Sequence, residues 1–175
     1  SLVPPHSPGL TMAGAGMLLV GWFGFNGGSA LAANATAGGA IVATHLAAAA
    51  AALAWIGAEW VKIGKPTSIG IVTGCVAGLA TITPASGFVG PMGAVGIGIA
   101  AGIVCFGATN FVKQRLVIDD SLDVFAVHGV GGMLGTVLVS VFALPVRGGA
   151  GLAAGMTLPK QLLVQLVGIA AAAVW

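Results

Sequence analysis

Long apolar runs alternate with short polar turns along this 175-residue chain. Several runs approach the roughly 20 residues that an α-helix needs to cross the hydrocarbon core of a bilayer. We expect complete transmembrane segments over residues 9–28, 40–61, 69–83, 92–112 and 122–143, and part of another over residues 158–175. The pattern therefore predicts an all-α polytopic membrane protein in which residues 1–175 form a single membrane domain, with five complete transmembrane helices and the start of another.

Composition narrows the class of protein further. Only 6% of the residues are charged and the mean hydropathy is +1.08, whereas a soluble domain is usually about one quarter charged. The net charge is +2 with six basic residues, too few for a face that binds nucleic acid. The sequence holds no phosphate-binding loop, metal-ligand cluster or nucleophile–base pair. We therefore expect neither a soluble protein nor an enzyme, and no cofactor or metal site.

The distribution of basic residues predicts the orientation in the membrane. Four of the six follow even-numbered segments and so fall on one side: Lys62, Lys65, Lys113 and Arg115. Arg147 and Lys160 fall on the other side. Because short cytoplasmic loops are enriched in Lys and Arg, we expect the first side to be cytoplasmic. The expected location is the cell membrane (plasma or inner), as a multi-pass protein.

The 30 glycines call for a physical reason, because glycine weakens helices in water. In membranes, small residues allow helix backbones to approach closely and pack by direct contact. Several glycines recur four residues apart on one helix face: Gly70, Gly74 and Gly78, then Gly98 and Gly102, then Gly131 and Gly135. We interpret these rows as helix-packing surfaces.

One face of the first segment combines aromatic and polar groups. Leu18, Trp22, Phe25 and Ser29 share this face at helical spacing. An ordinary packing stripe explains the pattern, and on spacing alone that explanation is favoured. The alternative is a lined path in which the negative faces of the rings attract a small cation.

The most informative polar position is His128, which lies in an apolar run from Val124 to Val146. An ionisable residue inside a transmembrane segment is usually functional. We expect a neutral imidazole that offers one donor and one acceptor. We expect Asp123 to stabilise the amino terminus of the helix that carries the histidine, and Asp119 and Asp120 to be solvated in the loop.

Two further polar residues lie in the second segment. His45 is followed by an alanine run and has no polar neighbour at helical spacing, so we interpret it as a packing or subunit-contact residue. Glu59 lies three residues before Lys62, and this spacing allows an ion pair between them.

Three motifs resemble those of the ammonium transporters of the Amt/Mep/Rh group. They are Gly21-Trp22-Phe23-Gly24-Phe25-Asn26, Thr81-Ile82-Thr83-Pro84-Ala85-Ser86-Gly87 and Asp123-Val124-Phe125-Ala126-Val127-His128-Gly129. The resemblance extends over the whole chain. It implies a fold of two inverted five-helix repeats plus a final helix, in a homotrimer with one pore per subunit. The chain resembles the second repeat, helices six to ten, with the beginning of helix eleven.

The resemblance also implies roles for single residues. His128 corresponds to the second of two pore histidines, Phe25 to one of two stacked gate phenylalanines, and Trp22 to a pore-lining indole. Ser29 corresponds to the hydroxyl of the external recruitment site. Leu18, Thr83 and Val124 correspond to other lining positions, and Asp123 to the carboxylate at the helix start. The first histidine, the other gate phenylalanine and the essential aspartate of the first repeat have no counterpart in this sequence.

The function implied by the resemblance is ammonium transport. Ammonium would be recruited at an aromatic outer vestibule and would cross a hydrophobic pore, past a histidine pair, as ammonia plus a proton or as ammonium. Methylammonium would serve as an analogue. Two alternatives remain open, namely an ammonium sensor or transceptor and a Rh-like gas channel. The implied partners are the lipid bilayer, two further copies of the chain and a regulatory protein of the PII type.

Overall fold

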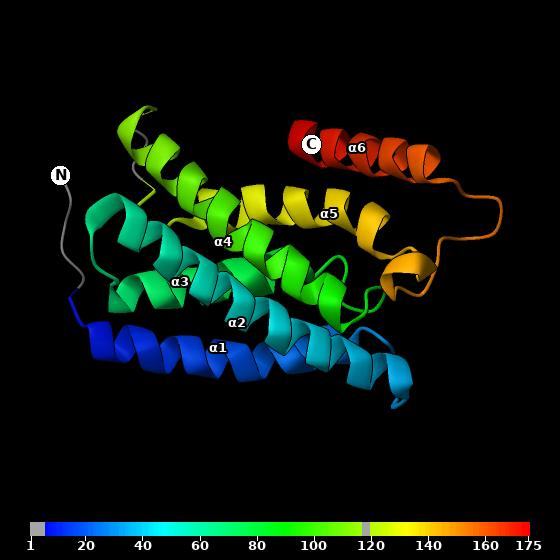
Figure 1. The fold of residues 1–175 in the computed structure, drawn as a ribbon, viewed down its shortest axis with the longest axis horizontal. Helices are drawn as coiled ribbons and strands as arrows, with labels where there is room; N and C mark the ends of the chain where they lie inside the picture. Colours follow the sequence, from blue (N-terminus) through cyan, green and yellow to red (C-terminus); the bar gives the residue numbers. More distant parts are fainter. Residues whose placement is uncertain (1–5, 117–119) are drawn as a thin grey trace.

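The computed structural model describes residues 6–116 and 120–175 and is built from helices. Its α-helices are α1 Pro8–Gly28, α2 Ala35–Ile63, α3 Ser68–Ile82, α4 Pro91–Gln114, α5 Gly131–Phe142 and α6 Leu158–Val174, laid side by side in an elongated bundle (Figure 1). A π-helical turn, Phe125–Val130, leads directly into α5, and a short 3₁₀ turn, Pro145–Arg147, follows it. No strand occurs in the described residues, which confirms the all-α prediction.

Within the described residues, four helices are long and apolar enough to cross a membrane. They are α1, α2, α4 and the continuous helix Phe125–Phe142, which joins the π-helical turn to α5. The apolar helices α3 and α6 have 15 and 17 residues. At about 1.5 Å per residue, α3 is roughly 22 Å long, shorter than a hydrocarbon core of about 30 Å. The expected count of five complete spans and a partial one therefore stays a prediction.

Capping residues explain where the helices begin. The Ser7 side chain accepts a hydrogen bond from the Leu10 N–H, and Pro8 occupies the first turn of α1. Asn34 caps α2 through the Ala37 N–H at 3.1 Å, and Thr67 caps α3 through the Gly70 N–H at 2.9 Å. Each cap satisfies a backbone donor that the helix itself leaves free.

Rows of glycine bring α3 and α4 against the backbone of α2 from two sides. A Cβ atom built on Gly78 of α3 would lie 2.5 Å from the Ala47 carbonyl oxygen, and one on Gly98 of α4 would overlap the same atom. One turn along α2, a Cβ on Gly102 would lie 2.5 Å from the Ala51 carbonyl oxygen. Side chains larger than hydrogen do not fit at these positions, so the interpretation of the glycine rows as packing surfaces is confirmed for all seven glycines.

The end of α2, the start of α3, the end of α4 and the start of the π-helical turn lie at the same end of the bundle (Figure 1). The four basic residues assigned to one side of the membrane, Lys62, Lys65, Lys113 and Arg115, belong to or adjoin these helix ends. The end of α5 and the start of α6 lie at the opposite end (Figure 1). Arg147 belongs to the 3₁₀ turn that follows α5, and Lys160 to the first turn of α6. The charge asymmetry used in the sequence argument is thus present in space, while the side that faces the cytoplasm stays a prediction.

The predicted Glu59–Lys62 pair is wrong. The buried Glu59 carboxylate accepts hydrogen bonds from the Thr67 backbone N–H at 2.8 Å and the Thr67 hydroxyl at 2.9 Å. Lys62 instead places its Nζ 5.5 Å from the centre of the Phe106 ring. The carboxylate gains two donors at the positive end of α3, whereas an exposed pair with Lys62 would contribute little.

Candidate functional site

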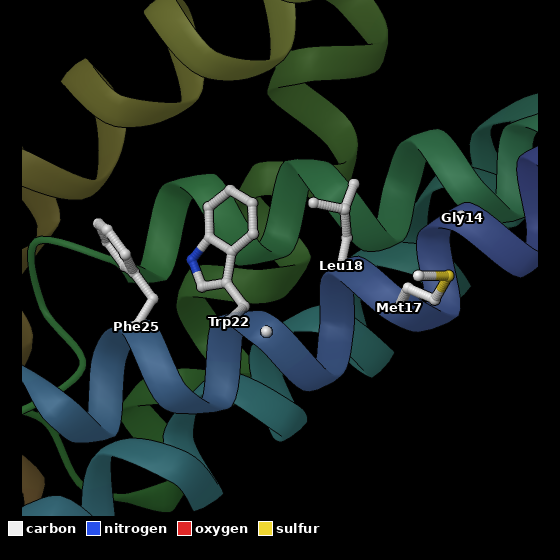
Figure 2. Close-up of a pocket in the computed structure, with 6 residues that line it drawn as sticks. Gly14, Met17, Leu18, Trp22 and Phe25 are labelled. Atoms are coloured by element: carbon white, nitrogen blue, oxygen red, sulfur yellow. The ribbon is translucent and has the colours of Figure 1, made fainter.

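The predicted face of α1 forms the wall of an apolar groove of about 600 Å³. Figure 2 shows the Leu18, Trp22 and Phe25 side chains projecting from the same side of the helix. The Trp22 and Phe25 ring centres are 6.1 Å apart, with the ring planes tilted by 58°. Gly14, Met17 and Gly21 complete the lining. Three of the predicted site residues therefore line one continuous surface.

The orientation of Trp22 is set by a hydrogen bond to the end of α3. The indole N–H donates to the Thr83 hydroxyl oxygen at 2.8 Å, and that hydroxyl donates to the Leu79 carbonyl at 2.7 Å. Thr83 is therefore fixed by its own helix while it holds the tryptophan of another. The structure brings Trp22 and Thr83, which are 61 residues apart in sequence, into direct contact.

His128 completes this arrangement from the π-helical turn. Its ring stacks on Trp22 with the centroids 6.3 Å apart and the planes inclined by 21°. Trp22 thus contacts both the Phe25 ring on its own helix and the imidazole of His128. His128 is exposed in this chain, and the ring on which it stacks lines the apolar groove.

Two predicted site residues lie at the margins of this cluster. Ser29 is exposed at the carboxyl end of α1, and its hydroxyl donates to the Phe25 carbonyl at 2.7 Å. Val124 is exposed in the turn that begins the histidine-bearing helix, four residues before His128. The structure therefore places Ser29 one helical turn beyond Phe25 and Val124 one turn before the imidazole.

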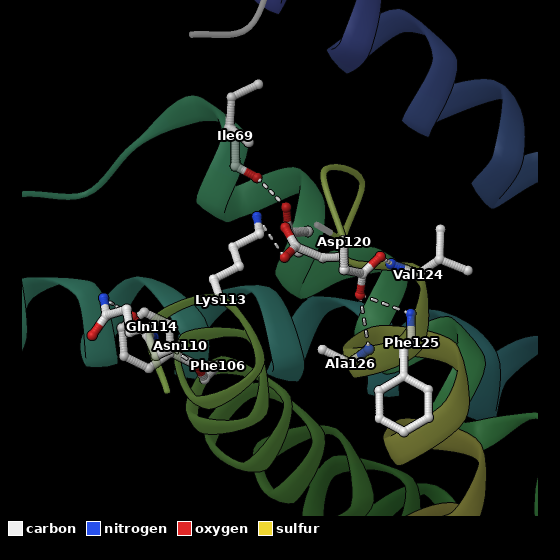
Figure 3. A network of polar contacts seen from close by, with 11 residues as sticks. Ile69, Phe106, Asn110, Lys113, Gln114, Asp120, Val124, Phe125 and Ala126 are labelled. Carbon is white, nitrogen blue, oxygen red and sulfur yellow. Dashed lines mark hydrogen bonds and ion pairs between the residues drawn. The ribbon is translucent and has the colours of Figure 1, made fainter. Parts of the chain in front are cut away.

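The prediction for the acidic residues needs correction, because Asp120 and not Asp123 caps the histidine-bearing helix. The Asp120 carboxylate accepts hydrogen bonds from the backbone N–H groups of Val124 at 2.8 Å, Phe125 at 3.0 Å and Ala126 at 3.4 Å (Figure 3). Asp120 is thus not simply solvated. Asp119 lies outside the described residues.

Asp123 has a different role, since it joins this helix to α4. Its carboxylate forms an ion pair with Lys113 at 2.7 Å. Burial raises the pKa of the Asp123 carboxyl, and the Lys113 ammonium opposes that rise. The backbone of Asp123 is left-handed, with φ of 56°, a conformation that residues other than glycine seldom adopt. The steric demand of this turn could not be read from the spacing of the acidic residues.

A buried polar pair was missed by the sequence argument. Asn26, only 2% exposed, donates from its side-chain amide to the Thr44 hydroxyl at 2.9 Å, and that hydroxyl donates to the Ala40 carbonyl at 2.6 Å. The signal was present, because an asparagine inside an apolar segment must find a partner. His45, the residue after Thr44, is exposed and packs edge-to-face with Phe23, with the ring centroids 6.0 Å apart. Its role as a packing or subunit-contact residue stays a prediction.

In the parts of the chain that the structure describes, no group of three or more His, Cys, Asp or Glu side chains could hold a metal ion. The candidate site therefore consists of an apolar surface, aromatic ring faces, the hydroxyls of Ser29 and Thr83, and the imidazole of His128. Such a surface suits a small cation that loses its water, or the neutral molecule that forms when the cation loses a proton.

Comparison with known proteins identifies the family. A model of the Ammonium Transporter Family matches residues 1–175. The chain belongs to the ammonium transporter family. Ammonium transporter Amt1 of Archaeoglobus fulgidus is 52% identical over 170 residues, which cover 96% of this chain and 42% of that protein. The ammonium transporter of Aquifex aeolicus is 49% identical, over 98% of this chain and 40% of its own length.

Solved structures of the family have the same fold. The crystal structure of Saccharomyces cerevisiae Mep2 superposes with a TM-score of 0.86 at 39% identity and covers 98% of this chain and 42% of the Mep2 chain. The chain thus spans about two fifths of the length of the relatives it matches. With its apolar helices, it is a membrane protein of this family.

Proposed function

We propose that this chain forms part of the pore of an ammonium transporter, with the series Phe25, Trp22 and His128 along the conduction path. The observation that carries this proposal is the stacking of His128 on Trp22 beside an apolar groove. A charged or polar group at such a position either lines a conduction path or bonds to another polar group, because hydrocarbon gives it no hydrogen bond. Membership of the ammonium transporter family supports ammonium as the substrate.

In this proposal the outer end of α1 receives the cation. The Phe25 ring is 62% exposed and offers its negative face, and the Ser29 hydroxyl lies one turn farther out. Cation–π attraction is strongest once water is removed, so a ring at this position would hold ammonium while it sheds its hydration shell. Leu18, Val124 and Thr83 then line the path with little competing polarity.

His128 supplies the polar contact within the path. A neutral imidazole can donate one hydrogen bond and accept another, so it can bind ammonia or receive and pass on a proton. K⁺ and Na⁺ lose their hydration shell in an apolar channel, and a lone imidazole does not compensate for that loss. We infer that selectivity arises from this combination, together with a second histidine contributed from outside these residues.

The assembly and its surroundings follow from the family as part of the same proposal. We place the protein in the plasma or inner membrane as a homotrimer, with a PII-type regulatory protein as its cytoplasmic partner. A solved relative described as a "Sensor Amt Protein" superposes with a TM-score of 0.88 at 36% identity. That likeness is the one observation that favours the sensor alternative.

The test is methylammonium uptake by cells that express the full-length protein as wild type, His128→Ala or His45→Ala. We expect His128→Ala to abolish selective uptake. His45→Ala is the matched control, since it removes an imidazole from α2 that contacts Phe23 and not Trp22. Equal uptake and selectivity in the wild type and His128→Ala would refute a pore role for His128.

Currents in a reconstituted bilayer separate the remaining alternatives. Ammonium-evoked current indicates net movement of charge, whereas flux without current indicates a gas channel. Normal flux combined with lost signalling after a change in a cytoplasmic loop would indicate the sensor. Among these outcomes, our proposal requires that wild-type protein carry ammonium and that loss of His128 remove that transport.

A further inference from the structure

The helix that carries His128 is wound in two different ways. Residues Phe125–Val130 form a π-helical turn, and α-helical winding resumes at Gly131. π-Helical turns are rare and occur mostly as single turns at functional sites. This one contains the single histidine that stacks on Trp22, so the reason for the local winding bears on the site.

The carboxyl side of the turn is held against α3. A Cβ atom on Gly131 would lie 2.8 Å from the Thr81 hydroxyl oxygen and 3.3 Å from the Cys105 sulfur, and one on Gly135 would overlap the Thr81 carbonyl. Gly131 and Gly135 are both buried, four residues apart on one face. At this end the helix has no room to rotate or to move toward α3.

The amino side of the turn is held against α4 and by its own cap. Asp123 pairs with Lys113 of α4 at 2.7 Å, and Asp120 binds three backbone N–H groups of the first turn. Between these two anchors, both Ala126 and Val127 are buried, at 0% and 3% exposure. In an α-helix, the residue four positions before Gly131, which is Val127, would share the packed face of Gly131. The wider winding of a π-helix also brings the residue five positions before Gly131, which is Ala126, to that face.

The winding also decides where His128 points. Three residues before Gly131, a side chain lies roughly 60° from the packed face in an α-helix and roughly 110° from it in a π-helix. The π-helical turn therefore carries the imidazole away from the contact with α3 and toward α1, where it meets Trp22. With α winding, His128 would lie closer to Thr81 and Cys105.

We propose that the contact between Gly131 and Thr81 fixes the π-helical turn and thereby holds His128 against Trp22, which makes Gly131 and Thr81 positioning residues for the pore histidine. This inference rests on the proposed function for its link to transport, but its geometric content does not depend on transport. Gly131 has no side chain that could bond to the Thr81 hydroxyl, so Thr81 acts on Gly131 through its bulk.

Three variants and a control test this contact in the full-length protein. Gly131→Ala introduces a methyl group against the Thr81 hydroxyl, and Thr81→Ala removes that hydroxyl. The double variant Thr81→Ala/Gly131→Ala removes the clash while it keeps the larger residue. Gly132→Ala is the matched control, because a Cβ there meets nothing within 4 Å although it follows Gly131 directly in the same helix.

The first readout is the ¹⁹F resonance of Trp22 in protein labelled with 5-fluorotryptophan, assigned by its loss in Trp22→Phe. The second is methylammonium uptake per folded protein. We expect Gly131→Ala to move the Trp22 resonance and to lower uptake about tenfold, equivalent to about 1.4 kcal/mol. Gly132→Ala should leave both readouts unchanged, and the double variant should restore both.

An unmoved Trp22 resonance in Gly131→Ala overturns the proposal, as does a double variant that behaves like Gly131→Ala. If Gly131→Ala yields no folded protein, Thr81→Ile presses on the same contact from α3, and an unmoved resonance there is equally decisive. Failure of the proposed function is a distinct result. Wild-type protein would then take up no methylammonium, while the resonance comparison alone would decide the role of Gly131 and Thr81.

Discussion

The hydrogen bond between Trp22 and Thr83 gives the sharpest prediction about the site. Thr83→Val keeps the shape of the side chain and removes the acceptor of the indole N–H, which donates at 2.8 Å. An unsatisfied buried donor costs about 1–3 kcal/mol. Trp22 is only half-buried, so water can replace part of the lost bond and the lower end of that range applies.

A cost of about 1 to 1.4 kcal/mol lowers the population of the observed Trp22 orientation about five- to tenfold. Because His128 stacks on this ring, we expect methylammonium uptake by the full-length protein to fall by a similar factor. Thr83→Ser, which keeps the hydroxyl, is the matched control and should stay within about twofold of the wild type, since it loses no hydrogen bond.

A double-mutant cycle with Trp22→Phe shows whether Thr83 acts through the indole. In the Trp22→Phe background no N–H remains to be satisfied, so Thr83→Val should lower uptake little further. Two results would refute the reasoning: equal uptake by Thr83→Val and Thr83→Ser, or the same additional loss from Thr83→Val whether or not Trp22 is present. The second result would mean that Thr83 acts on the substrate directly.

Two predictions concern stability. Gly78→Ala places a methyl group 2.5 Å from the Ala47 carbonyl oxygen and should destabilise the protein by about 1–3 kcal/mol, seen as a lower melting temperature in detergent. Gly107→Ala is the control, because a Cβ atom there meets nothing within 4 Å and should leave the melting temperature unchanged. Equal melting temperatures for the two variants would contradict the packing role of Gly78. Asp120→Ala removes the acceptor of three backbone N–H groups and should destabilise the helix start by about 1–2 kcal/mol. Amide hydrogen exchange at Val124, Phe125 and Ala126 should become faster, and Asp120→Asn should give intermediate exchange rates. Unchanged exchange would show that the cap contributes nothing.

The parts of the fold that depend on local periodicity could be predicted from the sequence. Glycines four residues apart identified the packing faces of α3, α4 and α5, because the period of an α-helix places such residues on one face. Trp22 and Phe25 were placed on a common face for the same reason, and their ring contact follows from it. These predictions need no knowledge of neighbouring helices.

The parts that depend on neighbouring helices were missed or wrong. Glu59 was paired with Lys62 from helical spacing, but Thr67 offers two donors only after the chain has turned back into α3. Asp123 was assigned the cap, but its left-handed backbone and Lys113 leave that role to Asp120. The π-helical turn has no sequence signature of its own, because its winding depends on contacts at both ends that involve α3 and α4.

The contacts on the two sides of α2 have a mechanical consequence. Gly78 and Gly98 approach the same carbonyl of Ala47, one from α3 and the other from α4. Neither helix can slide or rotate without first withdrawing from the α2 backbone, so α2, α3 and α4 move as one rigid body. Thr83, which holds the Trp22 indole, adjoins this body at the end of α3. Release of the indole would therefore come from rotation of side chains and exchange of water, on the timescale of rotamer changes, and would not require the slower displacement of α2, α3 or α4.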